Sequence, residues 1–290
     1  MPVALMLLVL GSKTMAQSPI AEGAKLEKLS GGYTFAEGAA RKANGDVFFT
    51  DQPNDRIIRW DGKAASDWKK PAGRSNGTAF DSKGNLIACA DEVNQLWSIS
   101  PTGDVTVLIK DYHGGLLNGP NDVWIRPDDA LYFTDPLYAR DYWKRSPARQ
   151  QPGEYVYFVT ADRKYVVPVI TDLKKPNGIV GTPDGKTLFV SDIGAGETFK
   201  YSIQKDGTLT DKTSFCKLGS DGMSLDDEGN VYLTGQGVTI FDKTGTKIDH
   251  IDVPEAWTGN VTFGGKDRKT LVITASKGLY GIKMRTKGAD

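Results

Sequence analysis

The sequence predicts an all-β protein, a six-bladed β-propeller with an N-terminal strand that closes the last blade. Three observations support this fold. A hairpin-like unit recurs six times, its copies start about 39 to 56 residues apart, and the chain is rich in glycine and proline. Propeller blades repeat at roughly 40 to 50 residues and consist of short strands joined by tight turns. We therefore expect a single propeller domain over residues 19–290.

The unit is clearest in residues 176–192, PNGIVGTPDGKTLFVSD. A polar pair is followed by an apolar run, a Pro-Asp-Gly turn and a second apolar run, which is the pattern of a β-hairpin. In the other copies a polar residue also stands at the head of the first run. These head residues are predicted to be Glu37, Asn76, Asn121, Asn177, Asp221 and Asn260.

The last copy has room for only three strands, although a blade needs four. Because an open ring would expose two unpaired strand edges, we place residues 25–29 as the outer strand of the sixth blade. The third copy differs by a long excursion after Asp135, PLYARDYWKRSPARQQPGEY, which is rich in aromatic residues and arginine. Long loops inside compact domains are usually functional or disordered. The head of a hairpin and the tail of its second strand lie at the same end, so the excursion is expected to cover the channel mouth near the head residues.

Residues 1–18 have the apolar stretch and the small-residue end of a secretory signal peptide, which predicts a periplasmic or secreted protein. No other apolar run approaches the about 18 residues of a membrane span. The two cysteines, Cys89 and Cys216, fall in different units and are expected to be unpaired and buried.

The chain carries 36 basic and 36 acidic residues. This balance argues against nucleic acid or an anionic membrane as a partner. The sequence carries no signal for a particular oligomeric state.

The six head residues would bring two carboxylates and four carboxamides to the channel axis. They include no Cys or His, which argues against zinc or copper. Calcium accepts six to eight oxygen ligands, including carboxamide oxygens, and is therefore the cation that such a set would select. Asn-Gly and Asp-Gly pairs are also ordinary turn residues, and any one pair alone is more often a turn than a ligand.

Several motifs, taken together, resemble the gluconolactonase-like branch of the SMP-30/gluconolactonase/LRE family of six-bladed, calcium-dependent propellers. They are AEG from Ala36, RSNGTAFD from Arg74, LNGPNDV from Leu117, YFTDPLY from Tyr132 and SDGMSLDDEGNVYLTG from Ser220. The resemblance implies a Ca2+ ion, or another divalent cation in its place. The implied ligands are Glu37, Asn177, Asp221 and Asn121, with Asn121 either a fourth ligand or a substrate contact.

The resemblance also implies a hydrolase that opens a sugar lactone or a related small ester. Asp221 is then the candidate general base, or else a residue that only orients the attacking water. Predicted contacts for the substrate are Asn76, Asn121, Asp135, His113, Arg74, Tyr138 and Trp143. A non-catalytic, calcium-stabilised binding propeller and an organophosphate-type esterase are the alternatives. The sequence contains no GxSxG motif and only two histidines, which argues against a catalytic serine triad.

Overall fold

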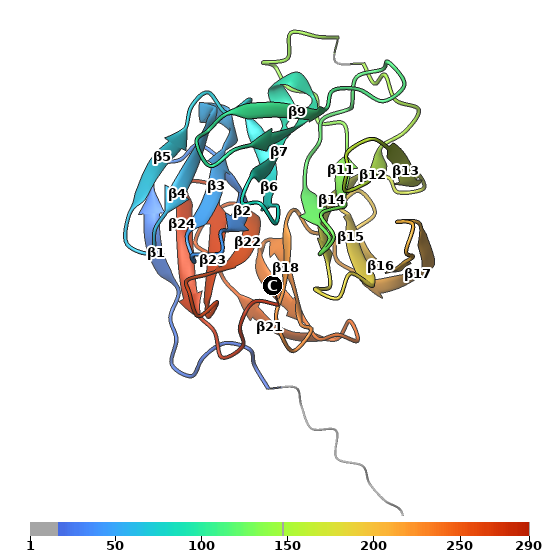
Figure 1. The fold of residues 1–290 in the computed structure, drawn as a ribbon. Coiled ribbons are helices and arrows are strands. Elements are labelled where there is room, and N and C mark those ends of the chain that lie inside the picture. Colours follow the sequence, from blue (N-terminus) through green and yellow to red (C-terminus); the bar gives the residue numbers. More distant parts are fainter. Residues whose placement is uncertain (1–16, 147, 290) are drawn as a thin grey trace, which may run out of the picture.

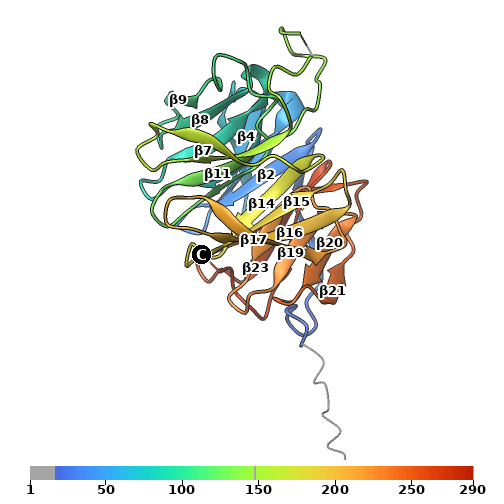
Figure 2. The same cartoon turned by 90° about the vertical axis from the view of Figure 1, so that its right-hand side faces the viewer.

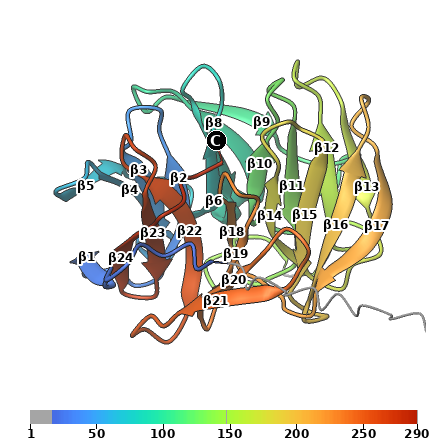
Figure 3. The same ribbon diagram turned by 90° about the horizontal axis from the view of Figure 1, so that it is seen from below.

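The computed structural model describes residues 17–146 and 148–289, and these form six four-stranded antiparallel sheets set around a central channel (Figure 1). Each sheet is one blade. Figure 3 shows the innermost strands β2, β6, β10, β14, β18 and β22 surrounding the centre. The predicted six-bladed propeller is confirmed.

Blades 1 and 2 contain the strands β2 (Ala36–Arg41), β3 (Val47–Asp51), β4 (Arg56–Trp60), β5 (Ala65–Lys69), β6 (Ser75–Phe80), β7 (Leu86–Ala90), β8 (Gln95–Ile99) and β9 (Val105–Ile109). Blades 3 and 4 contain β10 (Val123–Ile125), β11 (Leu131–Asp135), β12 (Tyr155–Val159), β13 (Val166–Ile170), β14 (Pro176–Gly181), β15 (Thr187–Asp192), β16 (Glu197–Ile203) and β17 (Leu209–Cys216). Blades 5 and 6 contain β18 (Met223–Leu225), β19 (Val231–Gly235), β20 (Gly237–Phe241), β21 (Lys247–Ile251), β22 (Thr258–Gly264), β23 (Thr270–Ala275), β24 (Gly278–Lys283) and β1 (Glu27–Gly31).

The N-terminal strand β1 pairs with β24 and is the outer strand of blade 6, as predicted. It begins two residues later than predicted because Leu26 packs on the core between blades 5 and 6 instead of pairing. The first and last strands of the chain therefore complete the same sheet, and the ring has no open edge.

The apolar core is divided among the gaps between neighbouring blades. Six clusters of buried side chains each join two adjacent blades, as when Phe133 and Tyr157 of blade 3 pack with Leu96 of blade 2. Cys89 and Cys216 belong to two of these clusters and are unpaired, which confirms the prediction. Because packing occupies the blade faces, the channel is left for polar groups.

Of the predicted signal segment, residues 1–18, only Gln17 and Ser18 lie in the described part of the chain. Ser18 Oγ donates to the Asp249 carboxylate in blade 5, and the backbone N–H of Arg285 donates to the Pro19 carbonyl (2.8 Å). Ser18 therefore belongs structurally to the propeller. No helix in the described residues has the length and apolar character to cross a membrane.

Figure 2 shows the blades from the side, with the excursion between β11 and β12 projecting from the body. We call this segment, residues 136–146 and 148–154, the lid.

Candidate functional site

The head residues lie where the innermost strands begin, and there the strand pairing is irregular. The register between the inner and second strands shifts between Glu37 and Ala40, between Ser75 and Thr78, and between Pro176 and Ile179. A bulge of this kind turns a side chain out of the pleat. The irregularity therefore allows the head residues to face the channel instead of a neighbouring blade.

Glu37 and Asp221 form a carboxylate pair at this end of the channel. The Glu37 side chain is buried, and burial together with the neighbouring Asp221 carboxylate raises its pKa well above the usual range. Burial also raises the pKa of Asp221, against hydrogen bonds from Trp257, Glu37 and Asn177 that lower it. Trp257 Nε1 donates to Asp221 Oδ2 at 2.6 Å, so the indole fixes the orientation of this carboxylate.

Asn177 stands beside this pair and is buried. Its Nδ2 donates to the Tyr138 hydroxyl of the lid at 3.1 Å. Its Oδ1 is buried and has no hydrogen-bond partner among the described residues. A buried acceptor without a donor is costly, and each such atom in a folded protein calls for an explanation such as an ion.

Asn76 and Asn121 are also buried. Their backbone carbonyls accept hydrogen bonds from Thr50 Oγ1 (3.1 Å) and from the Gly77 N–H (2.7 Å), which tie neighbouring blades together. In the described part of the chain their side-chain atoms make no hydrogen bond and are not sealed from solvent. Both carboxamides are therefore available to a ligand in the channel.

The head residue of blade 6 is Gly259, and the prediction of Asn260 at this position is wrong by one residue. The Asn260 N–H donates to Thr274 Oγ1 (3.0 Å), as the Gly222 N–H donates to Thr234 Oγ1 (2.7 Å) in blade 5. Asn260 thus corresponds to the residue after the head. A Cβ atom on Gly259 would lie 2.6 Å from Glu37 Oε1, so the missing side chain makes room for the Glu37 carboxylate.

Asp135 does not reach the head residues. It is fully buried, and its two carboxylate oxygens accept hydrogen bonds from the backbone N–H groups of Asn118 and Gly119, both at 2.9 Å. Asp192 holds Lys174 and Lys175 in the same way in blade 4. Asp135 thus positions the segment that leads to Asn121.

Burial raises the pKa of Asp135 to about 7, against the lowering effect of its N–H donors. We therefore expect the melting temperature of the chelated protein to fall as pH rises from about 4 to about 7, since an unfolded aspartate ionises near 3.9. Over that interval the folded protein retains a proton that the unfolded chain has released, so rising pH favours unfolding. Below this pH interval the Asp135 carboxyl is protonated in both states. Above it the carboxyl is ionised in both states, and burial of its charge destabilises the folded protein in full.

Calorimetry in excess chelator across this pH range measures the effect, with Asp135→Asn as the comparison. The variant should show a shallower slope of melting temperature against pH. Equal slopes in the two proteins would contradict the assignment to Asp135.

Asp91 anchors the lid. It stands at the end of the second strand of blade 2, and its carboxylate accepts from the lid residues Arg140 (Nε, 3.0 Å) and Tyr142 (hydroxyl) and from Gln52 (Nε2, 3.0 Å) of blade 1. Trp143 Nε1 donates to the Asp91 carbonyl at 2.9 Å. These contacts fasten the lid to blade 2. The positive charge of Arg140 also lowers the pKa of Asp221 and so partly offsets the rise that burial causes.

The other predicted substrate contacts lie at different depths. Tyr138 contacts the side chain of Asn177, beside the carboxylate pair. Trp143 is a buried residue of the lid and helps to attach the lid to blade 2. Arg74 donates to the Pro53 carbonyl and stacks on the Tyr142 ring, 4.5 Å from its centroid. His113 is exposed in a loop against the Tyr112 ring, so the structure does not bring it to the head residues.

Residues 35–277 match the family described as SMP-30/Gluconolactonase/LRE-like region. The chain belongs to this family. It is 26% identical over 294 residues to a gluconolactonase from Zymomonas mobilis, covering 91% of this chain and 82% of the relative.

Two solved structures are also similar to this chain. A gluconolactonase from Xanthomonas campestris shares 26% identity with a TM-score of 0.84, covering 92% of this chain and 91% of that one. A gluconolactonase candidate solved by X-ray crystallography shares 28% identity with a TM-score of 0.87, covering 94% and 96%.

The residues present fit the divalent cation that the SMP-30/gluconolactonase resemblance implies. Two buried carboxylates in contact repel one another unless a proton or a cation lies between them, and Asn177 Oδ1 is an acceptor without a donor. Within residues 17–146 and 148–289 no group of three or more His, Cys, Asp or Glu side chains is placed to hold a metal ion. Carboxamide oxygens would therefore have to complete this ligand set, as calcium permits.

Sequence reasoning missed Trp257, Arg140 and Asp91. Asp91 lies one residue beyond the strand-end position of Asp51 and Asp135, and the aromatic and basic lid is the signal for its different partners. Trp257 lies two residues before the head of blade 6, and only the folded ring brings it to Asp221 in blade 5.

Proposed function

We propose that this member of the SMP-30/gluconolactonase family is a calcium-dependent hydrolase that opens sugar lactones. The observation that carries the proposal is the cluster of Glu37, Asp221 and Asn177, in which a carboxylate pair faces an acceptor that lacks a donor. The gluconolactonases among its relatives support the substrate class. The signal-like residues 1–18 support a periplasmic or secreted location, which we propose as well.

Glu37, Asp221 and Asn177 would hold the ion, and Asn121 would be either a fourth ligand or a contact for the substrate. Bound calcium would supply Lewis acidity toward the lactone carbonyl and compensate the charge that develops on its oxygen. Asp221, held by Trp257, accepts a hydrogen bond from the attacking water and so orients it. A carboxylate that binds a divalent cation is a weak base, and orientation is therefore the role we assign to it.

Arg140 of the lid and Lys175, which directly precedes β14, place positive charge near the cluster. Arg140 and Lys175 flank the Tyr138 ring, 5.5 Å and 4.6 Å from its centroid. Opening a lactone creates a carboxylate where the substrate was neutral. The two cations therefore favour the product and the transition state that leads to it, whereas they contribute little to binding the neutral substrate.

The test is hydrolysis of a panel of aldonolactones by the chain from Gln17, with calcium, after chelation, and after calcium is restored. We expect turnover that disappears on chelation and returns with calcium. An aryl phosphotriester in the same panel examines the esterase alternative. Undiminished turnover after chelation would contradict a metal-dependent mechanism, and a calcium-raised melting temperature without turnover on any substrate would indicate a binding propeller.

A further inference from the structure

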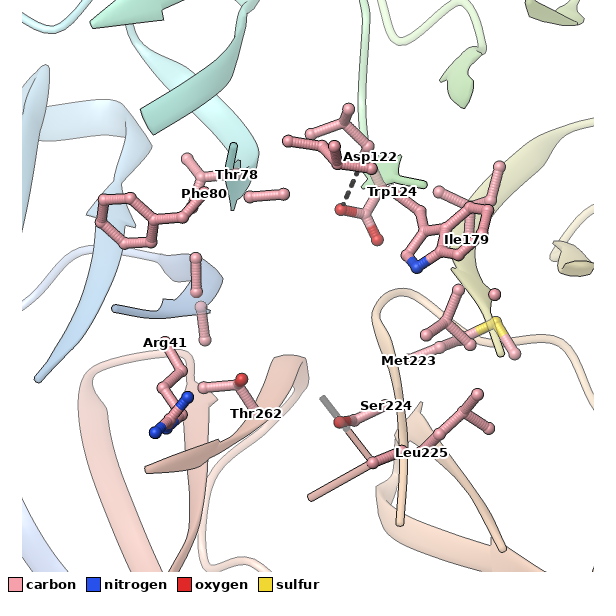
Figure 4. Close-up of a pocket in the computed structure, with 18 of the residues that line it drawn as sticks. Arg41, Thr78, Phe80, Asp122, Trp124, Ile179, Met223, Ser224, Leu225 and Thr262 are labelled. Atoms are coloured by element: carbon pink, nitrogen blue, oxygen red, sulfur yellow. Dashed lines mark hydrogen bonds between the residues drawn. The ribbon is translucent and has the colours of Figure 1, made fainter. Parts of the chain in front are cut away.

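A second cavity opens at the other end of the channel (Figure 4). It measures about 490 Å3, within the usual range for small-molecule sites. The residues that end the inner strands line it, among them Arg41 of β2, Phe80 of β6 and Leu225 of β18. Glu37, Asn177 and Asp221 belong to the beginnings of these strands, so this far cavity lies on the opposite face from the candidate active site.

The inner end of the far cavity carries a side chain that the repeat does not require. The residue after the head is glycine in four blades, the neutral Asn260 in blade 6 and the acidic Asp122 in blade 3. The adjacent Gly77 makes room for it, because a Cβ atom there would lie 2.4 Å from Asp122 Oδ1. The carboxylate is only 6% exposed and accepts hydrogen bonds from the backbone N–H groups of Val123 (2.9 Å) and Ile179.

Trp124 provides a donor beside this acceptor. Its ring is held between Tyr132, on which it stacks at 6.1 Å, and Gly181, where a Cβ atom would approach it to 2.4 Å. Figure 4 shows its indole nitrogen directed into the open space below Asp122. Among the described residues no acceptor binds this N–H.

The remaining surface combines apolar walls with hydroxyl groups. Ile179, Met223 and Leu225 lie on one side, and Ser224 and Thr262 lie across the open space from Asp122 (Figure 4). Apolar walls with a few convergent polar groups are the usual composition of a small-molecule site.

The other charged side chains around the far cavity have partners of their own, and among the described residues none of them pairs with Asp122 at the inner end. Arg126 pairs with Asp128 at 3.0 Å, and the Arg41 guanidinium donates to the Gly265 carbonyl at the rim (3.3 Å). Asp81 accepts a hydrogen bond within its own turn, and Asp129 accepts one from the Ser82 N–H of the neighbouring blade (2.9 Å). In the described part of the protein no Lys, Arg or His side chain makes an ion pair with Asp122.

We propose that the far cavity binds a small organic ammonium ion, with its N–H groups on Asp122 and its apolar body against Trp124, Ile179 and Leu225. An ammonium group supplies both the positive charge and the directed donors that a buried carboxylate needs. Trp124, Ile179 and Leu225 present apolar surface beside Asp122, and this favours a carbon skeleton over a hydrated inorganic ion.

Calorimetric titration of the calcium-saturated protein tests this assignment, with 2-phenylethylammonium as the probe and 2-phenylethanol as its neutral isostere. We expect the ammonium to bind at least about tenfold more tightly than the alcohol. Asp122→Asn should abolish that preference. Thr262→Trp or Ser224→Phe should fill the mouth and weaken both probes while lactone hydrolysis is retained.

Equal affinity for the two probes would overturn the proposal, as would an unchanged preference in Asp122→Asn. Displacement of the ammonium by rising calcium would assign the cavity to an inorganic cation and would also overturn it. If Asp122→Asn does not fold, the preference in the parent protein and the weaker binding of both probes in Thr262→Trp or Ser224→Phe decide the matter. Because lactone hydrolysis is measured separately, a negative result here leaves the proposed function standing.

Discussion

Asp221→Asn should reduce calcium-dependent lactone hydrolysis by at least about a thousandfold, because the change removes one of two carboxylates from the proposed ion site and the water-orienting group at once. The loss should appear in kcat as well as in calcium affinity. Fold disruption is not the expected cause, since asparagine has the same shape and retains one acceptor for Trp257 Nε1, now 2.6 Å from Asp221 Oδ2.

Trp257→Phe is the matched control. It keeps Asp221 and removes only the N–H that orients it, so we expect a loss of about 10- to 100-fold, the range typical of partners that support a metal ligand. Steady-state kinetics over a range of calcium concentrations separate the two variants. Comparable activity in Asp221→Asn and the parent protein would move the catalytic centre away from this carboxylate.

Gly259→Ala should weaken calcium binding by at least about a hundredfold without changing any proposed ligand. The new methyl group would lie 2.6 Å from Glu37 Oε1, 2.7 Å from its Cδ and 2.9 Å from the Ala36 carbonyl oxygen, so the Glu37 carboxylate and the backbone beside it must move away. The backbone at Gly259 does not have a positive φ, and the substitution therefore acts through space rather than through backbone strain.

Isothermal titration with calcium measures this effect, and Gly115→Ala is the control. Its Cβ atom would meet the flexible end of Gln151 at 3.1 Å, far from the cluster, so calcium affinity should be unchanged. If Gly259→Ala binds calcium as the parent does, Glu37 is not a ligand in the position described.

The repeat predicted the propeller and its closure because turn residues and apolar runs are local signals that every blade repeats. It failed at blade 6, where the order of the two residues is reversed: Gly259 precedes Asn260, whereas Asn177 precedes Gly178. The repeat pattern assigns the head position to the polar residue, Asn260. Only the bond from Asn260 N–H to Thr274 Oγ1 identifies its true register.

The cluster of Glu37, Asn177 and Asp221 followed from position in the repeat, whereas its supporting residues did not. Asp135 ends the second strand of its blade and Asp91 directly follows that of its own, yet one holds backbone N–H groups and the other holds the lid. Which partner a carboxylate takes depends on what the neighbouring loop brings to it, and that is set by packing across blades. The same applies to Trp257, which serves the preceding blade.

The pairing of β1 with β24 also dictates the order of events during synthesis. Glu27 pairs with Gly281. The first strand to leave the ribosome, β1, therefore has no partner until nearly the whole chain has been synthesised. Contacts this distant in sequence form slowly, and until then the growing molecule is an open arc with an unpaired edge. A chain released before β24 is complete cannot close, and we expect such truncated products to be substrates for chaperones and proteases rather than partly active enzymes.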